Sequence, residues 1–178
     1  ALKRFADRLF VILPFEQDYY RKHGMEVAYH GNPLVDGVAS FKQDFDAEAW
    51  KREQGFDERP LVALLPGSRV REISGLLPVM LRVAQAHPEY QFAVAAAPSV
   101  PGQLYASLLE GSGARLIKQD TYALLASART GLVTSGTATL EAALFRLPQV
   151  VLYRTSALAY SLARLIIRVR HISLVNLI

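Results

Sequence analysis

Residues 131–141 have the pattern of a phosphate-binding turn between a strand and a helix. Residues 131–134 predict a short buried strand, and a helix is expected from residue 138 to about residue 145. Ser135, Gly136 and Thr137 form the tight turn that joins them. The first N–H groups of a helix carry a partial positive charge, so an anionic group, usually a phosphate, is their natural ligand.

Three side chains of this stretch could add contacts. Thr137 and Thr139 offer hydroxyl groups. Glu141 stands about one turn into the predicted helix, where its carboxylate could accept hydrogen bonds from a ribose diol. An ordinary strand–turn–helix of an α/β sheet explains the stretch equally well, with Thr137 as the N-cap and Glu141 in solvent.

Residues 65–69, Leu-Pro-Gly-Ser-Arg, form a second turn of the same kind. They also follow an apolar run and precede a predicted helix, and ligands of open α/β sheets bind at the carboxyl ends of strands. Gly67 lets the backbone approach a ligand, Ser68 can cap the helix or donate to a phosphate, and Arg69 offers a bidentate fork for a diphosphate. The alternative is a surface arginine paired with Glu72, three residues further on.

Two such turns in one half-sheet favour a nucleotide site over two unrelated turns. Neither turn matches the G-x-G-x-x-G or Walker A pattern. The sequence has no cysteine, which excludes disulfides, thiolate metal sites and a cysteine nucleophile. Its four histidines show no metal-ligand spacing, and no Ser-His-Asp arrangement is evident.

The composition is that of a globular protein. The 178 residues are 51% hydrophobic and 20% charged, enough for one core or one core and part of another. No apolar run reaches the roughly 18 residues of a membrane span, and the N-terminus has no signal-peptide pattern. Because the chain starts with Ala1 and breaks off at Ile178, we expect it to be a fragment of a longer protein.

Strands and helices alternate from residue 61 onward, which predicts βαβ units and a parallel sheet flanked by helices. Strands are expected at 61–65, 91–96, 114–118, 131–134 and 149–153, and helices up to 86 and at 101–109, 121–127, 138–145 and 156–169. Before this region we expect a buried strand at 9–13, a helix at 15–23 and a strand at 27–29. Residues 37–60 are polar and predict a connection between two units, with one helix from Asp46 through Glu53.

The basic residues are concentrated at one end of the chain. The net charge is +4, yet no aspartate or glutamate follows Glu141. Arg164 and Arg168 lie on the apolar helix expected at 156–169, and Arg170 follows it. Such a helix is typical of contact with an anionic membrane surface. The alternative is a core helix whose arginines extend to solvent, which is the commoner case.

Six motifs then occur in the order found in lipid-A-disaccharide synthases, and the chain resembles that family over essentially its whole length. They are LPFE at 13–16 with YRKHG at 20–24, GNPL at 31–34, LLPGSR at 64–69, TSGTATLE at 134–141, VVLYR at 150–154 and ISLVNLI at 172–178. The resemblance implies the GT-B fold, in which two Rossmann-like domains enclose the active site. It implies that residues 1–40 are the end of an N-terminal acceptor-side domain and residues 41–178 most of a nucleotide-sugar-binding domain.

The resemblance also implies a function. The family transfers 2,3-diacylglucosamine from its UDP derivative to 2,3-diacylglucosamine 1-phosphate, which forms the β-1,6 disaccharide of lipid A and releases UDP. It acts peripherally at the cytoplasmic face of the bacterial inner membrane. The implied partners are these two lipids and the anionic membrane surface, with no nucleic acid, no metal and no other cofactor. N–H groups and arginine must then balance the diphosphate charge.

Carried over residue by residue, the resemblance makes Arg69 the diphosphate contact, Ser135, Gly136 and Thr137 the phosphate turn, and Glu141 the ribose ligand. Asn176 matches an asparagine that the family places beside the donor, although Val175 stands where the family usually has proline. The family's catalytic base, an aspartate of the N-terminal domain, has no counterpart in this sequence. By itself the chain is therefore expected to bind the donor without catalysing transfer.

Two other functions remain open. GT-B folds also serve epimerases and other UDP-sugar transferases, which would share the phosphate turn and Glu141. A non-catalytic nucleotide-binding module would carry the same residues. Dependence on acylated substrates distinguishes the synthase from both.

Overall fold

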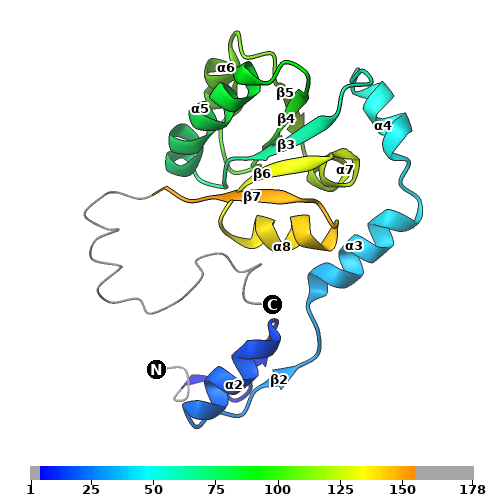
Figure 1. Ribbon diagram of the computed structural model, residues 1–178. Helices are drawn as coiled ribbons and strands as arrows, with labels where there is room; N and C mark the ends of the chain where they lie inside the picture. Colours follow the sequence, from blue (N-terminus) through cyan, green and yellow to red (C-terminus); the bar gives the residue numbers. More distant parts are fainter. Residues whose placement is uncertain (1–4, 155–178) are drawn as a thin grey trace.

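The structure is a computed structural model that describes residues 5–154 of the chain. In this part a small unit of two strands and a helix precedes a larger domain built on a five-stranded sheet, and α3 joins the two (Figure 1). The strands are β1 (Phe10–Val11), β2 (Ala28–Tyr29), β3 (Leu61–Leu65), β4 (Gln91–Ala96), β5 (Arg115–Lys118), β6 (Thr130–Thr134) and β7 (Gln149–Leu152). The helices are α2 (Pro14–Lys22), α3 (Pro33–Gln43), α4 (Ala47–Glu53), α5 (Val70–Ala86), α6 (Gly102–Leu109), α7 (Thr121–Ser127) and α8 (Thr137–Leu144).

The five strands of the larger sheet run parallel in the order β5-β4-β3-β6-β7. The predicted parallel α/β sheet is therefore confirmed, with strand ends within one residue of those expected. Parallel sheets need apolar residues on both faces because helices cover both. All five residues of β3 are buried, as this rule requires of a central strand.

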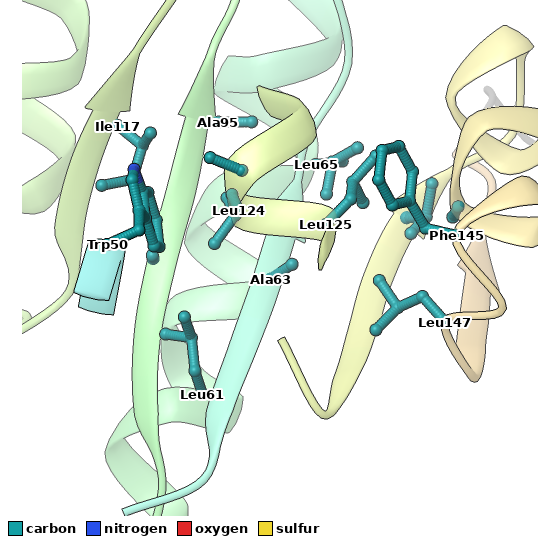
Figure 2. Packing of buried hydrophobic residues seen from close by; sticks show 14 of the residues in the cluster. Trp50, Leu61, Ala63, Leu65, Ala95, Ile117, Leu124, Leu125, Phe145 and Leu147 are labelled. Atoms are coloured by element: carbon teal, nitrogen blue, oxygen red, sulfur yellow. The ribbon is translucent and has the colours of Figure 1, made fainter. Parts of the chain in front are cut away.

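Alternate residues of the strands enter two separate hydrophobic clusters, one on each face of the sheet. Leu64 packs with α5 and α6 on one face, while Ala63 and Leu65 pack with α7 and α8 on the other. Figure 2 shows the second cluster, where Trp50 of α4 covers the sheet beside Ile117. The helices packed on each face thus fix the positions of the loops that connect them to the carboxyl ends of the strands.

The first third of the chain differs from the prediction. Residues 33–43 form helix α3 instead of the start of a polar connection. Asn32 caps this helix by accepting a hydrogen bond from the Leu34 N–H at 3.0 Å, and Pro33 occupies its first turn. Val38, only 3% exposed, anchors it to the cluster around Trp50. The helix spans position 40, at which the two predicted domains were divided.

The strand expected at 9–13 is also shorter than predicted. Only Phe10 and Val11 pair with β2, and Phe10 and Ile12 are largely exposed. A strand that has a single partner and one covered face buries only alternate residues, here Val11 and Leu13. The helix expected from Asp46 is confirmed as α4, because the Asp46 carboxylate accepts hydrogen bonds from the first N–H groups of that helix.

Several predicted features lie outside the described residues. They are the helix at 156–169, the arginines Arg164, Arg168 and Arg170, and Asn176. Within the part that the structure describes, no helix is both long and apolar enough to span a bilayer.

Candidate functional site

The two Gly-Ser turns lie next to each other at the middle of the sheet. Their strands, β3 and β6, are neighbours, and Leu65 pairs with Val133 just before the turns begin. From β3 the chain continues to β4 on one side, whereas β6 is followed by β7 on the other side. The connections leaving these two strands therefore diverge at the carboxyl ends of the strands, which is the arrangement of a topological switch point. Such a switch point is where open α/β sheets bind their ligands.

The turn after β6 leaves the start of α8 open to a ligand. Gly136 is the N-cap, with φ of +156°, and a Cβ at this position would meet no atom within 4 Å. The N–H groups of Thr137 and Ala138 have no acceptor within residues 5–154. The partial charge of these first N–H groups is thus available to an anion.

Two details of this turn correct the sequence analysis. The N-cap is Gly136, whereas Thr137 is the exposed first residue of the helix. Thr139 is fully buried, and its hydroxyl donates a hydrogen bond of 2.7 Å to the Gly136 carbonyl. Thr139 therefore holds the turn in shape and does not offer its hydroxyl to a ligand.

Glu141 lies one turn further along α8 and is half-buried. Within the described residues its carboxylate accepts no hydrogen bond and forms no ion pair. Burial raises the pKa of this carboxyl group. Burial, and after it the charge of Glu141, also raises the pKa of Tyr122 on α7. In the part of the chain that the structure describes, the carboxylate is thus a partly desolvated acceptor without a donor, which disagrees with a fully solvated surface glutamate.

The turn after β3 is closed by Glu72. Arg69 Nη1 lies 2.8 Å from Glu72 Oε1, so the predicted alternative pairing forms. The Ser68 N–H donates to the other carboxylate oxygen at 3.0 Å. The Arg69 side chain is 79% exposed, and a guanidinium has five donors, so this ion pair leaves most of them available to a ligand.

The backbone of Ser68 is fully engaged. Its N–H binds Glu72, and its carbonyl accepts a hydrogen bond of 3.1 Å from the Ser99 hydroxyl in the loop after β4. The N-cap of α5 is Arg69, so Ser68 does not cap the helix. Of the roles expected for Ser68, only donation from its exposed hydroxyl remains.

The structure therefore brings together the predicted residues of both turns and Glu141. Sequence reasoning gave Glu72 only an ion pair and missed its bond to the Ser68 backbone. The spacing of Arg69 and Glu72, three residues apart at a helix start, is the signal that could have revealed this bond. Sequence reasoning also missed that Tyr122 lies close enough to Glu141 to be affected by its charge, because no local motif marks this tyrosine. Among residues 5–154 no group of three or more metal-ligating side chains is arranged around a common point.

Two hollows of the described chain lie elsewhere. One, of about 490 Å³, is at the amino ends of the central strands, where Pro60, Phe92 and Thr130 line it. The other, of about 410 Å³, lies beside β1 and β2. Neither contains a residue of the two turns. The chemistry of the turns, and not the size of a hollow, identifies the candidate site.

Comparisons with known proteins give the family of the chain. The family model described as lipid-A-disaccharide synthetase matches residues 1–178. Curated lipid-A-disaccharide synthases from Myxococcus xanthus and Syntrophus aciditrophicus are 39% and 41% identical to the chain. Each match covers 100% of the chain and 48% of the relative, so the chain spans about half the length of these proteins.

A solved structure shares the fold. The UDP-GlcNAc 2-epimerase from Methanocaldococcus jannaschii superimposes with a TM-score of 0.58 over 89% of the chain and 50% of its own length. Its sequence identity is 14%, so the likeness concerns the GT-B-type Rossmann-like fold alone. The match of the family model over every residue is decisive: this chain belongs to the lipid-A-disaccharide synthetase family.

Proposed function

We propose that the chain is the donor-binding half of a lipid-A-disaccharide synthase. The enzyme would transfer 2,3-diacylglucosamine from its UDP derivative to 2,3-diacylglucosamine 1-phosphate and release UDP. One observation carries the assignment of the donor site: within residues 5–154, the half-buried Glu141 carboxylate has no donor, and it lies one turn beyond helix N–H groups that have no acceptor there. UDP presents the complementary groups, a diphosphate followed by a ribose diol.

The chemistry follows from the charges that develop during transfer. As the bond from the sugar to the diphosphate breaks, negative charge accumulates on the leaving UDP. The N–H groups at the start of α8 and the Arg69 guanidinium stabilise that charge, while Glu141 holds the ribose. The Gly67 and Ser68 backbone sets the position of Arg69, and the Ser68 hydroxyl adds a donor. This scheme uses no metal and no other cofactor.

Family membership supports our proposal for the remaining parts of the enzyme. We infer that residues 1–40 end the acceptor-side domain and that the larger domain starts near residue 41. The general base would come from the acceptor-side domain, outside this chain. Asn176 would lie beside the donor sugar.

The test is a chimera in which residues 1–178 replace the corresponding half of the Myxococcus xanthus relative. We expect this protein to release UDP only when both lipid substrates are present, whereas residues 1–178 alone bind UDP and transfer nothing. Release of UDP without the acceptor would instead indicate a hydrolase or an epimerase. A chimera that folds but releases no UDP with both lipids would refute the proposed activity.

We also propose that the enzyme acts at the cytoplasmic face of the inner membrane, held there by Arg164, Arg168 and Arg170. Two observations support this proposal. No acidic residue follows Glu141, so the end of the chain is basic, and the proposed substrates carry acyl chains. Each arginine near an anionic surface contributes about 1 kcal/mol. We expect binding to anionic vesicles that weakens with salt and falls when all three become glutamine.

The matched control changes three exposed arginines elsewhere, Arg21, Arg52 and Arg82, to glutamine, which removes the same charge. Sedimentation with vesicles is compared with thermal melting for both triple variants of the chimera. Equal loss of vesicle binding in both would show a general effect of net charge. If the variant of Arg164, Arg168 and Arg170 melts at a lower temperature but binds vesicles as before, these arginines belong to a core helix instead.

A further inference from the structure

The turn between β3 and α5 already binds an anion, the carboxylate of Glu72. Both oxygens are used, one by the Ser68 N–H at 3.0 Å and the other by Arg69 Nη1 at 2.8 Å. These are the donors that the sequence offers to a diphosphate. The side chain that occupies them comes from the first turn of the same helix.

The backbone is shaped around this carboxylate. Gly67 adopts φ of +118°, a region that side chains rarely tolerate. A Cβ on Gly67 would lie 2.6 Å from Glu72 Oε2 and 2.8 Å from Glu72 Cβ, closer than atoms can approach. The glycine is therefore required by the presence of Glu72 as well as by the turn itself.

Glu72 is also charged at neutral pH. Burial acts to raise its pKa, but the hydrogen bonds from Arg69 and from the Ser68 N–H outweigh burial and lower the pKa below its ordinary value. Its side chain is 32% exposed, against 79% for Arg69. The carboxylate thus faces the turn, while most of the guanidinium is exposed to solvent.

Two roles for this carboxylate predict opposite effects. If Glu72 only competed with the ligand, removal of its charge would free both donors and strengthen diphosphate binding. If Glu72 positions the turn, its removal would let Arg69 move and would weaken binding, although a negative charge has been lost. The geometry favours the positioning role, because Glu72 engages a single Arg69 nitrogen and leaves the other donors exposed.

We propose that Glu72 is a positioning residue of the diphosphate site, which fixes the Gly67–Ser68 turn and directs Arg69 toward the switch point between β3 and β6. The proposal rests on the proposed function, in which a nucleoside diphosphate binds there. Groups that orient a ligand-binding side chain commonly change affinity about tenfold or more when they are removed.

The experiment is calorimetry on residues 1–178 with inorganic pyrophosphate, UDP and uridine as probes. For Glu72→Gln we expect roughly tenfold weaker binding of pyrophosphate and UDP with unchanged binding of uridine. A merely structural role would lower the melting temperature and affect all three probes alike. The matched control is Glu48→Gln, which breaks another glutamate pair spaced by three residues, with Lys51 on α4.

Gly67→Ala serves as a second variant, because its Cβ would clash with Glu72 and displace the same carboxylate. This variant should also bind pyrophosphate and UDP more weakly with unchanged binding of uridine, and it tests the proposal even if Glu72→Gln folds poorly. If the wild type binds pyrophosphate and Glu72→Gln binds it equally or more tightly, the positioning role is overturned and the proposed function stands. A wild-type chain that binds neither pyrophosphate nor UDP overturns the proposed function together with it.

Discussion

Replacement of Arg69 by alanine is expected to weaken UDP binding by roughly ten- to a hundredfold, since one charge-assisted contact contributes about 1.5–3 kcal/mol. Uridine, which lacks phosphate, should bind the variant as tightly as the wild type. The loss also includes a repulsive part, because Glu72 would remain close to the diphosphate without its partner. Calorimetry with UDP and uridine measures both affinities on the same protein.

A suitable control for Arg69→Ala is Arg82→Ala on the same helix. Arg82 is exposed and lies more than three turns further along α5, so the variant removes the same charge without touching the turn. It should leave UDP binding unchanged. If Arg69→Ala weakened uridine and UDP equally, Arg69 would not contact the diphosphate.

The five-stranded sheet could be predicted closely because its sequence signals are local and agree with each other. Strands such as β3 are continuous apolar runs, as fully covered parallel strands must be, and turns with glycine or proline separate them. The position of the site follows from the same pattern, since both turns come directly after strands. Their adjacency depends on strand order, and only the fold reveals that β6 lies beside β3.

Helix α3 was missed for a physical reason. Its apolar residues Leu34, Val38 and Phe41 have helical spacing, but exposed polar residues and Gly37 surround them and resemble a connection. What stabilises the helix is tertiary, the packing of Val38 and Phe41 against α7 and α8. The bond from the Ser68 N–H to Glu72 and the half-buried position of Glu141 likewise depend on side-chain geometry, which periodicity does not reveal.

Substitution of Glu141 by alanine should abolish the preference of the site for ribose over deoxyribose. A charged acceptor bound to a hydroxyl contributes about 1.5–3 kcal/mol, so UDP should bind the variant roughly ten- to a hundredfold more weakly. The affinity for 2′-deoxy-UDP, which has already lost one of the two hydroxyl groups, should fall by less. The ratio of the two affinities therefore isolates the ribose contact from general damage to the site. Pyrophosphate, which has no ribose, provides the matched probe and should bind unchanged.

Stability gives an independent check on the same residue. Because the folded pKa of Glu141 is raised above its ordinary value of 4.5, the folded chain binds this proton more tightly than the unfolded chain. The stabilisation that the protonated carboxyl group gives the fold is therefore lost as the pH rises from about 4.5 through the folded pKa. Above that pKa, the ionised group lowers the free energy of unfolding by a constant amount. Glu141→Gln should consequently melt no lower than the wild type at neutral pH, and its advantage should vanish in acid. A glutamine variant that melted well below the wild type at neutral pH would show that the carboxylate has a stabilising partner. Unchanged discrimination between UDP and 2′-deoxy-UDP in Glu141→Ala would remove Glu141 from the ribose site.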